Sequence, residues 1–298
     1  MNAAQKVIKY FAYGLACLLA FTIISAIVTA AAAILSVFGI LDKGALESRV
    51  DCSGYEKCLS LSLGFSELEI KKGEELNATA EDSNVEIVKD GDRLTIKDAK
   101  KGIFSRHSNR KITVTIPEDM EFDAVGIGDR GGKITAEKIV AREIDFDLGT
   151  GETVFEYLSV ADRAKIDTGV GKFEIKDGAI KNGDIHLGIG EAVIRAALTG
   201  DNKVDAGIGS VNLDLLLPDS AYTIRADKGI GRIIFNGSDM SDDSIIGNGD
   251  NSVDVDGGIG QIEIHTAEKP VEEKPAETQT VETQPAEKKP EAKPEIDE

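Results

Sequence analysis

The chain has no tryptophan, only 5% aromatic residues and three histidines among its 298 residues. Ligand pockets are usually lined with apolar and aromatic side chains, so this composition argues against a sugar-processing groove. His107, His186 and His265 stand far apart and lack partners at metal-ligand spacing. The G-x-S-x-G, H-E-x-x-H and P-loop motifs are missing as well. We therefore expect no enzyme, with a carbohydrate-active β-solenoid enzyme as a minor alternative.

Basic residues are also scarce. Lysine and arginine number 34 against 53 aspartates and glutamates, which gives a formal net charge of −19. Such a surface repels nucleic acids and anionic headgroups, and it favours solubility or cationic partners. We expect no nucleic-acid partner.

Cysteine occurs three times. Cys17 lies in an apolar run, whereas Cys52 and Cys58 follow that run with five residues between them. In an oxidising compartment Cys52 and Cys58 could form a disulfide, and two unpaired thiols are the alternative. No second Cys/His pair completes a zinc site.

Residues 10–41 carry no charge. A membrane span needs about 20 apolar residues, so this run predicts one transmembrane helix after a short cytoplasmic N-terminus, 1–9. A cleaved signal peptide would have an apolar region of only about 7 to 15 residues. The positive-inside rule leans slightly towards a cytoplasmic N-terminus. The sequence thus predicts a single-pass protein of the cell membrane, with its main domain outside the cytoplasm.

Proline is confined mostly to the end of the chain, where five of the seven prolines follow residue 267. A segment rich in proline, glutamate and lysine cannot bury a core, so residues 267–298 are predicted to be a disordered tail. Residues 42–58 read as a juxtamembrane linker, which leaves 59–266 as the folded part.

Glycine is abundant and regularly spaced. A Gly-x-Gly pair recurs seven times, and apolar residues follow it at alternate positions, as in a half-buried strand. The pairs are Gly126 and Gly128, Gly149 and Gly151, Gly169 and Gly171, Gly188 and Gly190, Gly207 and Gly209, Gly229 and Gly231, and Gly258 and Gly260.

A strand that recurs about every 20 residues after the same turn cannot bury its apolar face alone. Stacked neighbours solve this problem, so residues 123–266 are predicted to be a parallel β-solenoid of about seven coils. Glycine suits corners that need a positive φ or a close backbone approach. Residues 59–122 read as ordinary strands, with a hairpin at Asp90-Gly91 and extra loop residues later at 236–252. The fold class is all-β, with 59–122 capping one end of the solenoid.

Aspartates precede five of the glycine pairs by two residues and should stack as a ladder that His186 interrupts. Each carboxylate could accept N–H groups of the glycine turn, which is the favoured interpretation, or the ladder could hold divalent cations. The five residues are Asp147, Asp167, Asp205, Asp227 and Asp256.

Two further motifs are read as by-products of the repeat, and no cofactor is expected. Gly126 to Gly131 matches G-x-G-x-x-G, but a dinucleotide site needs a helix after it, and a strand is expected here. Residues 252–263 approach a calcium-binding loop, but Ser252 replaces its first aspartate and a strand follows.

The strand Lys111–Pro117, the segment Phe122–Val125 and the repeated Gly-x-Gly coils resemble a bacterial adhesin-like family, also called the Toastrack domain. The resemblance covers roughly 60–266 and implies a β-solenoid in a cell-envelope protein, often beside a transmembrane helix, without catalytic residues. We therefore expect a non-enzymatic, membrane-anchored envelope protein that presents a β-solenoid for adhesion or for contact with a protein or the cell wall. A sensor or accessory subunit of an envelope-stress system is the alternative.

Overall fold

The computed structural model describes residues 49–98 and 111–267, which lie in one compact unit. The expected cytoplasmic N-terminus, the expected span at 10–41 and the tail from residue 268 lie outside the described residues.

No helix in the described ranges is long and apolar enough to cross a membrane.

Strands make up most of the described chain, joined by two short 3-10 turns. The 3-10 turns are η1 (Cys52–Gly54) and η2 (Asp219–Ala221). The strands are β1 (Cys58–Gly73), β2 (Asn77–Ala80), β3 (Val85–Asp90), β4 (Arg93–Asp98), β5 (Lys111–Pro117), β6 (Phe122–Ala136), β7 (Ile139–Phe155), β8 (Leu158–Ile175), β9 (Gly178–Lys181), β10 (Gly183–Thr199), β11 (Asp201–Pro218), β12 (Tyr222–Asp227), β13 (Ile230–Phe235), β14 (Ser238–Asp239), β15 (Ser244–Gly247), β16 (Asn251–Asp256) and β17 (Ile259–Ala267).

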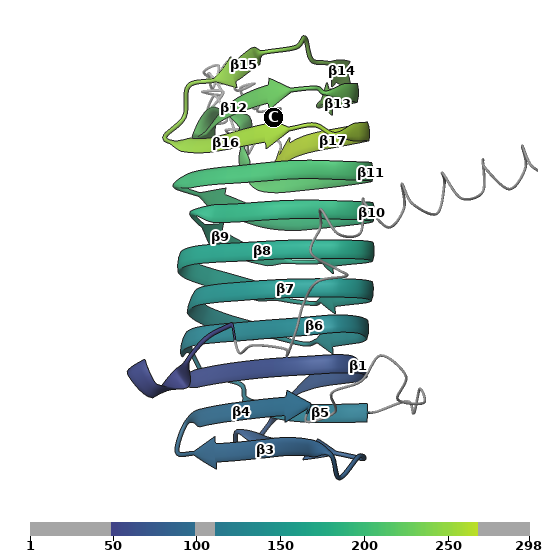
Figure 1. Ribbon diagram of the computed structural model, residues 1–298. Helices are drawn as coiled ribbons and strands as arrows, with labels where there is room; N and C mark the ends of the chain where they lie inside the picture. The colour runs from purple at the N-terminus through teal and green to yellow at the C-terminus, as the bar shows by residue number, and fades with distance from the viewer. Residues whose placement is uncertain (1–48, 99–110, 268–298) are drawn as a thin grey trace, which may run out of the picture. The chain divides into compact units, whose positions relative to one another are not determined.

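The long strands stack in parallel, one coil upon the next, from β1 through β6, β7, β8 and β10 to β11 (Figure 1). The register is tight, because equivalent positions of successive repeats stand opposite each other, as Phe155 and Ile175 do. The predicted all-β class is confirmed for the described residues, which form one large and mostly parallel sheet, consistent with the predicted parallel β-solenoid. The backbone of each coil pairs with that of the next coil, and the inward apolar side chains form one continuous core.

The core follows the predicted alternation. The second residue after each corner is buried at Phe173, Ala192, Val211, Ile262 and Ile233. Aromatic rings pack against one another in the middle of the core. The ring centroids of Phe155 and Phe146 lie 5.3 Å apart in a stacked arrangement, and those of Phe155 and Phe173 lie 6.2 Å apart in an edge-on arrangement. Burying such a side chain contributes roughly 1.5–3 kcal/mol.

The first end of the stack differs from the expectation. The strand β1 belongs to the expected cap at 59–122, yet it lies directly beside β6 and forms a coil of its own. Its inward leucines resemble those of the other coils, but Ser66 stands opposite Gly132, where the repeat pattern would require glycine. The cap proper consists of β2 and β3, which run antiparallel to β5 and β4. The hairpin predicted at Asp90-Gly91 joins β3 to β4 and is confirmed.

The other end departs from chain order. Strands β16 and β17 insert between β11 on one side and β12 with β13 on the other. The segment 236–252, expected to be a loop, forms β14 and β15, which pair antiparallel with β13 and β12 (Figure 1). An open parallel edge would template the addition of further strands, and this antiparallel hairpin layer covers it.

Candidate functional site

A strip of stacked glycines runs along one corner of the solenoid. The second glycines of successive corners stand opposite each other, and most have φ between +135° and +145°. A Cβ atom on Gly190 would lie 1.9 Å from the carbonyl oxygen of Gly171, and one on Gly209 would lie 1.9 Å from that of Gly190. Both the backbone conformation and the neighbouring coil therefore require glycine. The strip consists of Gly132, Gly151, Gly171, Gly190, Gly209, Gly260 and Gly231.

The first expected corner pair is placed elsewhere. Gly126 and Gly128 lie within β6, opposite Asp145 and Asp147, and Gly131 and Gly132 form that coil's corner. A Cβ on Gly126 would lie 2.9 Å from both the backbone nitrogen and Cβ of Val50. Glycine at position 126 thus makes room for the entering chain rather than for a turn. Because strand follows the G-x-G-x-x-G sequence instead of a helix, the arrangement lacks the helix N-terminus of a dinucleotide site.

The entering chain carries the two cysteines. Cys52 in η1 and Cys58 at the start of β1 form a disulfide, with their Cα atoms 5.4 Å apart. The loop that they close holds Tyr55, whose backbone N–H donates to the carbonyl oxygen of Cys52. The disulfide thereby fixes the segment that passes over Gly126.

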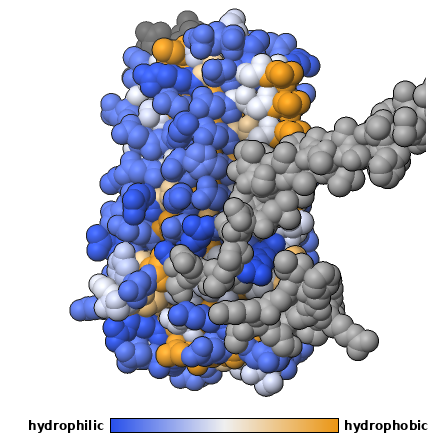
Figure 2. Space-filling view, viewed as in Figure 1, coloured by the Kyte–Doolittle hydropathy of each residue, from blue (hydrophilic) through white to orange (hydrophobic). Residues whose placement is uncertain are grey.

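The middle residues of the glycine corners form a row that we call the corner ridge. Their side chains point outward, and their exposed fractions rise along the stack to 38% for Ile208, 50% for Ile259 and 74% for Ile230. Figure 2 shows hydrophobic side chains stacked at one edge in the upper part of the view. The corner ridge consists of Val170, Ile189, Ile208, Ile259 and Ile230.

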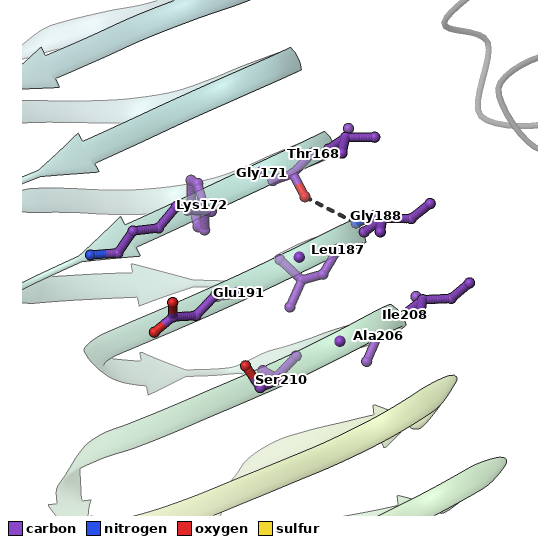
Figure 3. A pocket seen from close by; sticks show the side chains of 18 of the residues that line it. Thr168, Gly171, Lys172, Leu187, Gly188, Glu191, Ala206, Ile208 and Ser210 are labelled. Atoms are coloured by element: carbon purple, nitrogen blue, oxygen red, sulfur yellow. Dashed lines mark hydrogen bonds between the residues drawn. The ribbon is translucent and has the colours of Figure 1, made fainter. Parts of the chain in front are cut away.

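A groove follows the glycine strip. Figure 3 shows Ile208 on one side of the strip and Lys172, Glu191 and Ser210 on the other. The space in the groove, counted with the open solvent inside it, is about 670 Å³. Because the floor is glycine, a ligand there would meet backbone atoms between an apolar wall and a polar wall.

The predicted aspartate ladder is assembled by the fold. Its order is Asp147, Asp167, His186, Asp205, Asp256 and Asp227, so the inserted strand exchanges the last two positions relative to the sequence. We call this column the acidic ladder. Its carboxylates lie on the flat face that leads into the glycine corner.

Lysine, arginine and histidine side chains, rather than turn N–H groups, contact most carboxylates of the acidic ladder. Lys203 Nζ lies 2.9 Å from a carboxylate oxygen of Asp205 and 3.2 Å from one of Asp256. His186 Nδ1 lies 2.7 Å from Asp205. Asp227 makes the turn contact that was favoured from sequence, because the Gly229 N–H donates to its carboxylate at 3.2 Å.

The first two aspartates of the acidic ladder also face cationic side chains. Asp147 pairs with Arg49, and Asp167 lies 3.4 Å from Lys165 Nζ. In the part of the chain that the structure describes, no group of three or more His, Cys, Asp or Glu side chains could hold a metal ion. The cation interpretation of the ladder thus gains no support from the geometry.

A second column, two residues earlier in each coil, was not recognised from the sequence. It alternates in charge from coil to coil, so every carboxylate has a cation on the adjacent strand. Opposite charges at directly paired positions stabilise a sheet. We call this column the mixed ladder, and it consists of Asp145, Lys165, Asp184, Lys203, Asp254 and Arg225.

One carboxyl group lies inside the corner. Asp129 is only 8% exposed, and its Oδ1 has no hydrogen-bond partner. Burial raises the pKa of Asp129 to about 7, while the hydrogen bond from the backbone N–H of Gly131 acts to lower it. Its neighbours on the adjacent coils are Leu63 and Leu148, so a charge here replaces an apolar side chain of the same column.

The remaining predicted features are separated. Asp254 and Asp256, from the calcium-loop-like sequence, lie on β16 and face Arg225 and Lys203. His265 lies 3.6 Å from Glu263, and His107 falls outside the described residues. His186 and His265 therefore contact different carboxylates.

The fold and its corner define a parallel β-solenoid with antiparallel caps. A family model described as Toastrack DUF4097 matches residues 59–255, more than half of the chain, and the chain belongs to this family. A comparison with curated proteins finds no significant match.

Solved structures similar to the chain include two bacterial proteins. A putative cell adhesion protein from Clostridium sporogenes is 20% identical, with 73% of this chain and 96% of that chain covered and a TM-score of 0.30. A putative adhesin from Bacteroides fragilis is 12% identical, with 70% of this chain and 94% of that chain covered and a TM-score of 0.24.

Proposed function

We propose that this chain is a non-enzymatic envelope protein that presents its solenoid as a contact surface for a protein or the cell wall, as in adhesion. The observation that carries the proposal is the set of outward side-chain columns that the fold holds in register. Solenoids use such extended, regular surfaces for binding. The mixed ladder, the acidic ladder and the corner ridge together give this surface a repeated chemical pattern along the stack.

The proposal includes a membrane anchor at residues 10–41, with the solenoid outside the cytoplasm. The uncharged run in the sequence supports the anchor. The disulfide between Cys52 and Cys58 supports an oxidising compartment for the solenoid.

Crosslinking of the full chain in intact cells, with and without wall-targeting stress, tests the proposal. We expect a protein or wall polymer to be captured by the wild-type chain and by Gly54→Ala, because open space surrounds Gly54. Capture should be lost with Gly209→Ala, which disturbs the stack. Equal capture by the stack-disrupted variant, or glycan turnover abolished by Asp→Ala changes in the coils, would contradict the proposal. Capture that rises under stress would favour the envelope-stress role.

A further inference from the structure

Asp129 places a carboxyl group in a column of mostly apolar side chains. The residues directly opposite it on the adjacent coils are Leu63 and Leu148, and later coils hold Leu187 and Ala206 at the equivalent place. Asp129 Oδ1 is shielded from solvent and has no hydrogen-bond partner. A buried acceptor without a donor is destabilising, and a buried carboxylate without a partner is more so. Asp129 is therefore tolerated best as a neutral carboxyl group.

Charged side chains around this corner face outward. The strands that pack against Asp129 are β1 and β7, and Lys133 Nζ of its own strand lies 3.1 Å from a carboxylate oxygen of Glu152 on β7. Asp147 of β7 pairs with Arg49. The inward side chains that face Asp129 are apolar, so burial is the main influence on its protonation. The charged residues at outward positions are Glu67, Arg130, Lys133, Asp147 and Glu152.

The corner that follows Asp129 has the backbone freedom to open. Gly131 takes the ridge position in this coil, where later coils carry Val170 and Ile189, and Gly132 comes next. Glycine restricts the backbone less than any other residue. Asp129 and Gly132 also line the first end of the groove. A small movement of this corner would therefore bring the carboxyl group to the solvent in the groove.

We propose that the corner of the β6 coil is a pH-sensitive gate at the first end of the groove, closed in acid and increasingly open towards neutral pH. In the closed corner the carboxyl group keeps its proton, because burial raises the pKa of Asp129 to about 7. In the open corner the group meets water, and its pKa returns towards the ordinary value of 3.8. Opening thus releases a proton between these two values, so a rise in pH favours the open form. Above about pH 7 both forms are ionised, and the dependence ends.

Native-state hydrogen exchange of the full chain, followed by mass spectrometry, tests the gate, whatever partner the solenoid contacts. The exchange rate of residues 129–134 is divided by that of Asp129→Asn, which removes the titration and keeps the shape of the side chain. This ratio cancels the intrinsic pH dependence of exchange when reclosing is fast. We expect the ratio to rise about 50-fold from pH 5 to pH 7 and less than about twofold from pH 7 to pH 8.

A second variant and a second corner serve as controls. Asp129→Leu continues the apolar column and should keep the corner equally protected at every pH; it also replaces Asp129→Asn as the reference if that variant does not fold. The equivalent corner at 206–211 should show a constant ratio. A constant ratio at 129–134 would overturn the inference. An equal rise at 206–211 would also overturn it, because ionisation would then loosen the whole solenoid rather than one corner.

Discussion

Replacing Gly209 by alanine should damage the solenoid at the point where its repeat is most demanding. The new Cβ would lie 1.9 Å from the carbonyl oxygen of Gly190, whereas real Cβ contacts essentially never fall under 3.0 Å, so a shift of at least about 1.1 Å is needed. The neighbouring coil on the other side limits that shift, because it packs so tightly that a Cβ on Gly260 would lie 1.8 Å from the carbonyl oxygen of Gly209. The φ of +141° adds strain for any residue with a side chain.

The strain of such a backbone alone costs about 1–3 kcal/mol, and the steric overlap adds to it. We expect a loss of at least ~3 kcal/mol in the free energy of unfolding, which corresponds to a fall of about 6–12 °C in melting temperature for a domain of this size. Thermal and urea unfolding of the full chain, followed by circular dichroism, measure both quantities.

Substitutions at two other glycines separate the effect of the close contact from the effect of the positive φ. Gly54 has open space and no positive φ, so Gly54→Ala should stay within about 0.5 kcal/mol of the wild type. Gly91 has open space but a φ of +60°, so Gly91→Ala should cost about 1 kcal/mol. If Gly209→Ala unfolds like Gly54→Ala, the stacked-corner reasoning is refuted.

Three further predictions concern the interior and the disulfide. Asp129 has a folded-state pKa raised from 3.8 to about 7, so its contribution to stability is greatest below about pH 4, declines as the pH rises to 7 and is constant above that. The decline amounts to at most about 4 kcal/mol, and the difference in unfolding free energy between wild type and Asp129→Asn should show it; a difference independent of pH would contradict the assignment. Phe155→Ala should cost about 3–5 kcal/mol in urea unfolding, because the ring is fully buried between Phe146 and Phe173, and a loss under 1 kcal/mol would mean that the rings do not pack as described. Reducing the Cys52–Cys58 disulfide should lower stability by about 2 kcal/mol, and an unchanged urea midpoint under reducing conditions would count against it.

The coil pattern could be predicted because it depends on residues close together in the sequence. Phe173 and Ile175 follow their corner at alternate positions, and this alternation alone specifies the inward face. The coil formed by β1 escaped detection because Ser66 occupies the glycine position and Phe65 the ridge position. Glycine pairs therefore do not mark this coil, although the leucines of β1 alternate as in the other coils.

The arrangement of the candidate site depended on register, which local sequence does not specify. The acidic ladder was predicted from spacing, but its partners were not, because Lys203 reaches Asp256 only when β16 lies next to β11. The mixed ladder was invisible for the same reason, since its charges alternate between coils rather than along a strand. The membrane anchor at 10–41 stays a prediction from sequence.

The corner ridge and both ladders depend on one feature, the insertion of β16 and β17 between β11 and the pair β12 and β13. Cysteines placed in pairs test this order directly, in a chain with Cys17→Ser. Ser210 stands opposite Gln261, which stands opposite Arg232. Disulfides need Cα atoms about 4.4–6.8 Å apart, a condition that adjacent coils meet and coils two steps apart do not. We predict that Ser210→Cys with Gln261→Cys forms a disulfide and that Ser210→Cys with Arg232→Cys does not. The opposite result would mean that the coils stack in chain order and would contradict the account.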